Sequence, residues 1–498
     1  MVPAPALRVN APRLGSAVHR VRAETLAVLG VSSAALVIRV ITLLLTVDTE
    51  GDGPSRAMQA YAWSRHPQVI MSSAGWLPGA SCWAGIASLL VPDPLIGPRL
   101  MNLLLGTLTV PVFYGLIRRL YGVPAALIGS MTLAAMPLHV GLSVSSLSEP
   151  SFLFFILAAL ACLAAAVGER GVRIPRLGLF LLSFVAAEMT RYEVWPLIPL
   201  VLLYLYWRTR SASTLVFCAA ILLLFPIEWS ISSYVHFGQA FYGLQLGMHP
   251  VDISGPVSVW TAFKKLGRLT TSHLGWLLSV TVVWGLITEL SRAIRGRVDA
   301  QRTAYVILVA VVWILIVAGA RSTGPALYGR NLLSGFVLAL PLAILPFLSP
   351  WGRARHRMAI VVAIGALASI GSVTLAYVMH HPNVWVTRTR PAQIVELARW
   401  LRESPYRGAA VLATRMKWAS TYLPLYAPEL SGRYVIVSEW VEDSALRRFI
   451  AERKPALLIT TAEDAQYRTR IEDVLRHPIP AERRVYSAGT VEVYDLSN

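Results

Sequence analysis

Residues 26–47 read LAVLGVSSAALVIRVITLLLTV, and the nine residues after them, 48–56, read DTEGDGPSR. A helix needs about 20 mostly apolar residues to cross the roughly 30 Å hydrocarbon core of a bilayer, and the first stretch is long enough. It is too long for the apolar segment of a signal peptide, and no clear cleavage site follows it. We therefore predict an uncleaved first span behind a basic N-terminal segment, residues 1–25, which contains Arg8, Arg13, Arg20 and Arg22.

The rest of the chain repeats this apolar pattern. Of its 498 residues, 55% are hydrophobic and only 14% are charged, whereas soluble domains carry about 25% charged residues. The predicted fold class is an α-helical polytopic membrane protein of about eleven spans. The predicted spans are 26–47, 98–117, 124–142, 150–167, 177–190, 194–207, 213–235, 273–290, 304–320, 331–349 and 358–379. Pro78 and Pro92 interrupt a further apolar stretch at 76–91, which is compatible with a re-entrant or interfacial helix instead of a span.

The basic residues predict an orientation. The formal net charge is +18. With a cytoplasmic N-terminus, the inner segments hold 18 basic residues and the longer outer segments before residue 380 hold about nine, which is the positive-inside pattern. We predict a plasma-membrane protein with its N-terminus inside and its C-terminus outside. Because the basic residues form short clusters between spans, and not a stripe with interleaved aromatic residues, we expect no nucleic-acid partner.

Two long outer loops interrupt the membrane part, residues 26–380, and a C-terminal domain follows it. The loops cover residues 48–97 and 236–272. Residues 385–498 are more polar, and a helix-type stretch at 391–403 is followed by short apolar runs at 409–413, 434–437 and 456–460. This alternation predicts a small α/β domain, which the orientation places outside the cell. Cys82, Cys162 and Cys218 form no zinc-binding motif.

The first outer loop begins with three carboxylates, Asp48, Glu50 and Asp52, followed by Arg56. Acids this close raise one another's pKa. One of them is a candidate general base towards a hydroxyl, and together they are candidates for holding a divalent cation. The alternative is a solvated loop whose acids cap the helix that begins after Pro54.

Three further groups are predicted at the outer ends of spans. Glu149, in a short turn before Pro150, points into an outward cavity or only caps a helix. Arg191 and Glu193 either pair with each other or present a guanidinium to a phosphate. Tyr328 and Arg330 precede the tenth span, where Arg330 at a helix N-terminus would bind an anion; the alternative for both is anchoring at the membrane interface.

The second outer loop contributes weaker candidates. His249, Asp252, Lys264, Lys265 and Arg268 are candidate contacts for an acceptor or a lipid headgroup, or simply belong to a mobile, solvated loop.

Over residues 30–380 the chain resembles the GT-C glycosyltransferases that use lipid-phosphate-sugar donors, such as protein O-mannosyltransferases and aminoarabinose transferases. The resemblance rests on the acidic start of the first outer loop, on Ser148-Glu149-Pro150, on Thr190-Arg191-Tyr192-Glu193, and on Tyr328-Gly329-Arg330. It implies that an acid of the first outer loop is the catalytic base. The family's adjacent Asp-Glu pair is replaced here by Asp48, Glu50 and Asp52, of which we select Asp52, with Glu50 second.

The resemblance also implies a mechanism. A polyprenyl-phosphate sugar would be attacked directly, with inversion, by an acceptor hydroxyl of a lipid, glycan or protein. Arg330 and Arg191 would stabilise the leaving phosphate. Some relatives use a divalent metal ion, and the sequence leaves this open. The rival hypotheses are a secondary transporter, which would show internal repeats with broken spans, and a flippase or non-catalytic scaffold of an envelope pathway.

Overall fold

The computed structural model describes residues 14–47, 52–67, 76–168, 171–243, 258–323, 329–348, 392–414, 419–430, 433–437, 441, 443–461 and 464–497. Asp48, Glu50 and Tyr328 lie outside these ranges, as do His249, Asp252 and the predicted span 358–379.

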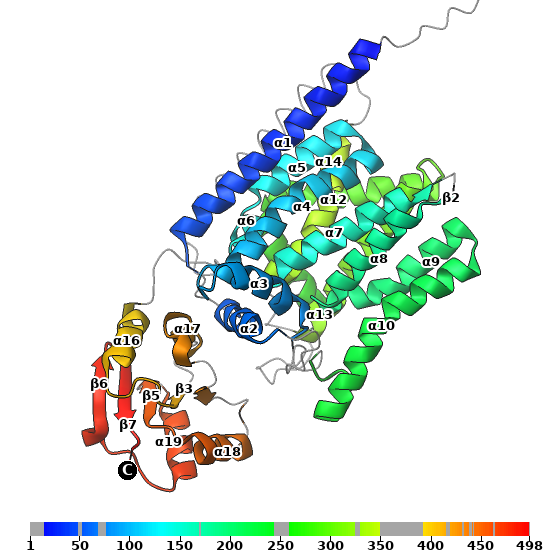
Figure 1. Cartoon of the computed structure of the whole chain (residues 1–498). Helices are drawn as coiled ribbons and strands as arrows, with labels where there is room; N and C mark the ends of the chain where they lie inside the picture. Colours follow the sequence, from blue (N-terminus) through cyan, green and yellow to red (C-terminus); the bar gives the residue numbers. More distant parts are fainter. Residues whose placement is uncertain are drawn as a thin grey trace, which may run out of the picture.

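Helices of 7 to 36 residues dominate the membrane part (Figure 1). They are α1 (Leu14–Leu45), α4 (Gly97–Tyr121), α5 (Val123–Ala135), α6 (Pro137–Ser143), α7 (Glu149–Ala166), α8 (Ile174–Glu188), α9 (Ile198–Thr209), α10 (Ala212–Phe237), α12 (Val259–Ile294), α13 (Ala300–Thr323) and α14 (Leu333–Leu348). Two short strands, β1 (Val167–Gly168) and β2 (Gly171–Val172), pair between α7 and α8.

Within the described residues, five helices are long and apolar enough to cross a membrane, namely α1, α4, α7, α10 and α13. Two bent helices raise the number to seven if each is one span: α5 with α6, bent by 59°, and α12, bent by 109° at Gly275. The remaining predicted spans before residue 350 coincide with the shorter apolar helices α8, α9 and α14. The polytopic helical fold is thus confirmed, and the total of eleven spans stays a prediction.

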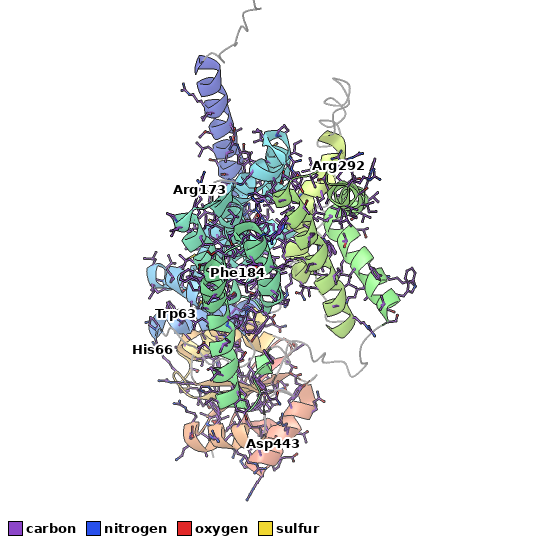
Figure 2. All side chains as sticks on the ribbon, turned by 90° about the vertical axis from the view of Figure 1, so that its right-hand side faces the viewer. Trp63, His66, Arg173, Phe184, Arg292 and Asp443 are labelled. Atoms are coloured by element: carbon purple, nitrogen blue, oxygen red, sulfur yellow. The ribbon has the colours of Figure 1, made fainter. Side chains whose placement is uncertain are left out.

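Short helices connect the long ones at one end of the bundle. They are α2 (Gly53–Arg65), α3 (Gly79–Leu90), η1 (Tyr192–Leu197) and η3 (Gly329–Leu332). Helix α3 covers the interrupted stretch 76–91 and, at 12 residues, is too short to span a bilayer as a helix. Figure 2 shows Trp63 of α2 and His66, directly after α2, near this end of the bundle, and Arg173 and Arg292 near the opposite end.

The C-terminal domain is α/β, as predicted from the sequence. Its sheet has the strand order β4-β3-β5-β7-β6, in which β4, β3 and β5 are parallel. Strand β7 is antiparallel to both β5 and β6. The elements are α16 (Ala392–Glu403), β3 (Val411–Thr414), α17 (Ala419–Tyr426), η5 (Pro428–Leu430), β4 (Tyr434–Val437), α18 (Asp443–Arg453), β5 (Leu457–Thr461), α19 (Ala465–Leu475), η7 (Ala481–Arg483), β6 (Arg484–Ala488) and β7 (Val491–Asp495).

This domain contacts the membrane part through α17, which packs against α2. Ala57 of α2 is buried within the same apolar cluster as Leu423 and Tyr426 of α17, and Met58 and Leu95 pack against that cluster. The domain therefore lies at the end of the bundle that carries the short helices (Figure 1).

Candidate active site

Four candidate residues, far apart in the sequence, meet at this end of the bundle. Asp52 directly precedes α2, Glu149 is the first residue of α7, Arg191 lies between α8 and η1, and Arg330 belongs to η3. Arg330 joins the two acids: its Nη2 lies 2.6 Å from Asp52 Oδ2, and its Nε lies 3.7 Å from Glu149 Oε1. The fold thus brings the segment before α2 to the segment before α14, although Asp52 and Arg330 are 278 residues apart.

A second arginine extends the network. Arg191 Nη1 lies 2.7 Å from Glu149 Oε1 and donates a hydrogen bond of 3.0 Å to Ser148 Oγ. Its Nε donates to Glu193 Oε1 at 2.8 Å. The predicted pairing of Arg191 with Glu193 is therefore present, but Arg191 also reaches Glu149. The charges form one chain from Asp52 through Arg330, Glu149 and Arg191 to Glu193.

The two acids that share Arg330 differ in how exposed they are. The Asp52 side chain is 36% exposed, whereas that of Glu149 is 4% exposed. A buried carboxylate needs charged partners and hydrogen bonds to remain ionised, and Glu149 has two arginines. Asp52 is thus the acid that a substrate can approach, and Glu149 is the acid that holds the arginines together.

Arg56 is the third arginine of the site. It lies one helical turn after Asp52, and its guanidinium carbon is 4.4 Å from the centre of the Trp76 ring, in a cation–π contact. Its Nε and Nη1 are buried and make no hydrogen bond within the described part of the chain.

The arginines keep Asp52 ionised. Burial alone would raise the pKa of this carboxyl, but the positive charges of Arg330 and Arg56 outweigh burial and hold it below its usual value. For Arg191, burial lowers the guanidinium pKa, and the carboxylates of Glu193 and Glu149 more than reverse this effect. Asp52 therefore enters a reaction near neutral pH as a carboxylate, the state that a general base requires.

Local sequence explains how the backbone presents these groups. Pro54 and Pro150 lie in the first turns of α2 and α7, where a missing backbone N–H costs nothing. Asp52 and Ser148 occupy the N-cap positions, but neither side chain makes a capping hydrogen bond. The alternative in which Asp52 merely caps α2 is therefore wrong, since its carboxylate turns to Arg330.

Two polar residues of α4 hold the turn before Glu149, and sequence reasoning missed both. Arg99 donates from Nε to Val144 O at 2.5 Å and from Nη1 to Thr46 O at 3.0 Å. Asn102 donates to Ser145 O and Leu147 O, at 2.8 and 2.6 Å. The sequence does carry a signal for both residues, because each is a strongly polar side chain inside an apolar span. Such side chains are rare in membrane helices and usually point into the bundle.

The turn that carries Arg191 is held by α3. Gly79 N donates to Met189 O at 2.7 Å, and a Cβ atom on Gly79 would lie only 2.6 Å from that oxygen. Glycine is thus the residue that permits this close contact.

The described residues leave little free space at the site. A cavity of about 10 Å³ is lined by Glu149, Arg191, Glu193 and Arg330, which is about the room needed for one water molecule. This cavity alone is too small for a substrate phosphate. The described residues contain no group of three or more metal-ligating side chains, and all three described acids of the network engage arginines; Asp48 and Glu50 lie outside the described ranges.

Comparisons with known proteins agree with this arrangement. Residues 55–191 match the family of dolichyl-phosphate-mannose-protein mannosyltransferases, a segment that includes Arg56, Glu149 and Arg191. No curated protein sequence matches the chain with significant similarity.

Solved structures extend the likeness to most of the chain. ArnT of Cupriavidus metallidurans bound to undecaprenyl phosphate aligns with a TM-score of 0.63 at 14% identity, over 94% of this chain and 97% of that one. The oligosaccharyltransferase of Archaeoglobus fulgidus in its apo form aligns with a TM-score of 0.59 at 11% identity, over 88% and 70%. Its complex with an inhibitory peptide and a dolichol-phosphate aligns with a TM-score of 0.57 at 11% identity, over 88% and 69%.

The fold is that of the GT-C glycosyltransferases, and residues 55–191 match a family of that superfamily. Both comparisons favour sugar transfer over the transporter and flippase alternatives. The GT-C fold also explains why a polytopic membrane protein gathers acids and arginines at one end of its bundle. The assignment of individual roles to Asp52, Glu149, Arg191, Glu193 and Arg330 rests on the geometry described above.

Proposed function

We propose that this GT-C protein transfers a sugar from a polyprenyl-phosphate donor to an acceptor hydroxyl at the outer membrane surface, with inversion. The observation that carries the proposal is the sharing of Arg330 between the partly exposed carboxylate of Asp52 and the buried carboxylate of Glu149. Two similar structures were solved with a polyprenyl phosphate, one with undecaprenyl phosphate and one with a dolichol-phosphate, which supports a donor of this class.

The donor phosphate binds the arginines. A guanidinium is planar, always charged and able to donate two parallel hydrogen bonds to phosphate oxygens. Arg330 and Arg191 lie on the same side of Glu149, because both approach its Oε1. Arg56 supplies a third positive charge, held against Trp76.

The reaction is a single displacement. The acceptor hydroxyl oxygen attacks the anomeric carbon of the sugar, and the bond between that carbon and the phosphate oxygen breaks with its electron pair on the phosphate. The hydroxyl proton moves to the Asp52 carboxylate. Negative charge thus disappears from Asp52 and appears on polyprenyl phosphate, while Arg330 remains between them and can follow the charge from one to the other.

This charge transfer explains why Asp52 can act as the general base although its pKa is lowered. As Arg330 turns towards the leaving phosphate, Asp52 loses the positive charge that lowers its pKa, so it becomes a stronger base as the reaction proceeds. Glu149 and Glu193 contribute by keeping Arg191 and Arg330 in position.

Three further residues belong to the proposal by their place in the sequence. Asp48 and Glu50, directly before Asp52, are the alternative bases and candidates for holding a divalent metal ion, and Tyr328, two residues before Arg330, is a candidate donor contact. No step above depends on a metal ion.

The proposed location is the plasma membrane, with the N-terminus inside and the C-terminal domain outside. The arginines at the end opposite the site fit this orientation (Figure 2). The acceptor is a lipid, a glycan or a protein, and we propose that the C-terminal domain selects it, because the domain contacts α2 next to Asp52. Unchanged acceptor choice after deletion of residues 385–498 would refute this role.

The experiment is a transfer assay in membranes supplied with labelled polyprenyl-phosphate sugars. We expect transfer from one donor, and a loss of about 10²–10⁴-fold in rate for Asp52→Asn, the range typical of a removed general base. Arg65→Gln is a matched control, since Arg65 lies at the far end of α2 and bonds Tyr61. Full activity in Asp52→Asn would move the base to Glu50 or Asp48, and no transfer from any donor would contradict the proposed donor class.

A further inference from the structure

A large cavity lies far from the candidate active site and has no part in the proposed reaction. Its volume is about 560 Å³, within the range of about 300–1,000 Å³ that is typical of ligand pockets. It is bounded by α4, α7, α9 and α13, and its walls include Leu116, Leu160, Leu163 and Leu308. On α7, Leu163 follows Glu149 by 14 residues, which at 1.5 Å per residue is about 21 Å along the helix.

The cavity opens sideways, between α9 and α13. Leu203 and Trp207 of α9 and Ile307 of α13 line it, with exposed fractions of 64%, 42% and 40%. Ile307 belongs to α13, which is long and apolar enough to cross a membrane, and the other two belong to α9, a mostly apolar helix of 12 residues. An apolar molecule dissolved in the bilayer can therefore enter the cavity without crossing water.

Arginines surround the end of the cavity nearest the membrane surface. Arg210 lines it directly, and Arg208 lies half-buried on the preceding turn of α9. Arg119 reaches the same rim, since its Nε donates at 3.3 Å to Oε1 of Gln301, another lining residue. Arg173 and Arg176 lie close enough to Arg119 for their positive charges to interact with it.

These arginines differ from Arg191 and Arg330 of the active site because they lack acidic partners. Within the described residues, Arg119, Arg208 and Arg210 form no ion pair with a carboxylate, and the Arg208 Nε is buried without a hydrogen-bond acceptor. Arg210 also adopts a left-handed backbone conformation, with φ of 52°, at a helix end where glycine is usually preferred. The rim thus carries positive charge that a ligand can neutralise.

We infer that this cavity binds an anionic phospholipid from the leaflet at that end of the bundle. Its acyl chains fill the leucine-lined space, and its phosphate meets Arg208, Arg210 and Arg119. The lipid connects α4 and α7 to α9 and α13 across the gap that separates them. Glu149 begins α7, and Arg330 belongs to η3, the next described element after α13, so the bound lipid stabilises the relative placement of helices that lead to the active site.

The test measures lipid binding to the purified full-length chain by native mass spectrometry. The probes are phosphatidylglycerol and phosphatidylcholine with identical acyl chains. We expect one phosphatidylglycerol per chain, bound at least tenfold more tightly than phosphatidylcholine. Arg208→Gln combined with Arg210→Gln removes this preference, and Leu163→Trp, which fills the cavity, weakens binding of both lipids. Arg295→Gln is the matched control, an exposed arginine at the same end of the bundle that does not line the cavity.

Equal binding of the two lipids by the native chain would overturn the inference, and so would an unchanged preference in the double variant. The thermal unfolding midpoint without lipid shows whether each variant is folded, and phosphatidylglycerol should raise that midpoint for the native chain and for Arg295→Gln, but not for the double variant. Should the double variant fail to fold, the single change Arg210→Gln decides the question, because Arg210 is exposed; retention of the full tenfold preference there would also overturn the inference.

Discussion

Arg330 contacts two carboxylates that differ in exposure, and this difference gives them different proposed roles. The partly exposed Asp52 takes part in the reaction, and the buried Glu149 supports the site. Asp52 exposes about a third of its side chain and meets Arg330 alone among the described residues, by a 2.6 Å ion pair. Glu149 is almost fully buried and accepts from Arg191 at 2.7 Å while lying near Arg330. Removing the charge of either acid should slow transfer strongly, but for different reasons, and stability measurements distinguish the two.

The pH dependence of transfer tests the pairing of Asp52 with Arg330. Since Arg330 helps to hold the Asp52 pKa below its usual value, the native enzyme should keep its activity until the pH falls below about 4. In Arg330→Gln the Asp52 pKa rises, so the carboxylate becomes protonated, and activity is lost, at a higher pH. We expect the acidic limb of kcat/KM to move to higher pH, whatever the loss in absolute rate.

The measurement is transfer between pH 3.5 and 8 in both enzymes, with Arg65→Gln as the control. An acidic limb at the same pH in Arg330→Gln would show that Arg330 does not tune the essential base.

Glu149→Gln should lower stability as well as activity. It removes the carboxylate shared by Arg191 and Arg330 at a site where all three side chains are at most 16% exposed. Breaking a buried ion pair typically costs about 3–5 kcal/mol, because the remaining charge is left without its partner. The thermal unfolding midpoint in detergent should therefore fall clearly for Glu149→Gln and little for Asp52→Asn. Equal midpoints for the two variants would contradict the supporting role of Glu149.

At the scale of helices, the contact between α3 and the turn after α8 places Arg191. Gly79→Ala would put a Cβ atom 2.6 Å from Met189 O, so the turn or α3 must shift. Such overpacking costs about 1–3 kcal/mol, and the shift displaces Arg191, two residues after Met189. We expect a lower unfolding midpoint and slower transfer.

Gly178→Ala is the matched control for this prediction. Gly178 lies in α8, and a Cβ atom there meets no atom within 4 Å, so the change should be neutral or slightly stabilising because alanine favours helix. If Gly79→Ala behaves like Gly178→Ala, the close contact with Met189 does not position Arg191.

The helices themselves were largely predictable, because membrane spans are long apolar segments whose backbone hydrogen bonds are satisfied locally. Residues 213–235, for example, lie inside α10, and the run 434–437 coincides with β4. The candidate site was predictable only as separate short motifs. That Asp52 pairs with Arg330, 278 residues away, depends on helix packing, which periodicity does not encode. Asn102 was missed for the same reason, since its partners are backbone carbonyls of another segment.

At the scale of the whole molecule, the C-terminal domain and the active site share helix α2. Asp52 directly precedes this helix, and Ala57, five residues later, is 1% exposed within the apolar cluster of the C-terminal domain. The face of α2 that receives α17 thus lies about one turn from the proposed base. Any change that moves α17 outward leaves this part of α2 without its packing partners.

Ala57→Trp should therefore slow transfer to every acceptor. The larger side chain separates α17 from α2, and the loosened start of α2 holds Asp52 less firmly near Arg330; misplacing a catalytic group by about 1 Å can cost about 10²-fold in rate. Asp443→Asn is the control, because this exposed residue begins α18, at the part of the domain far from Trp63 (Figure 2). The rates are measured with at least two acceptors: a uniform loss in Ala57→Trp supports coupling through α2, whereas a loss confined to one acceptor would place the effect in acceptor recognition alone.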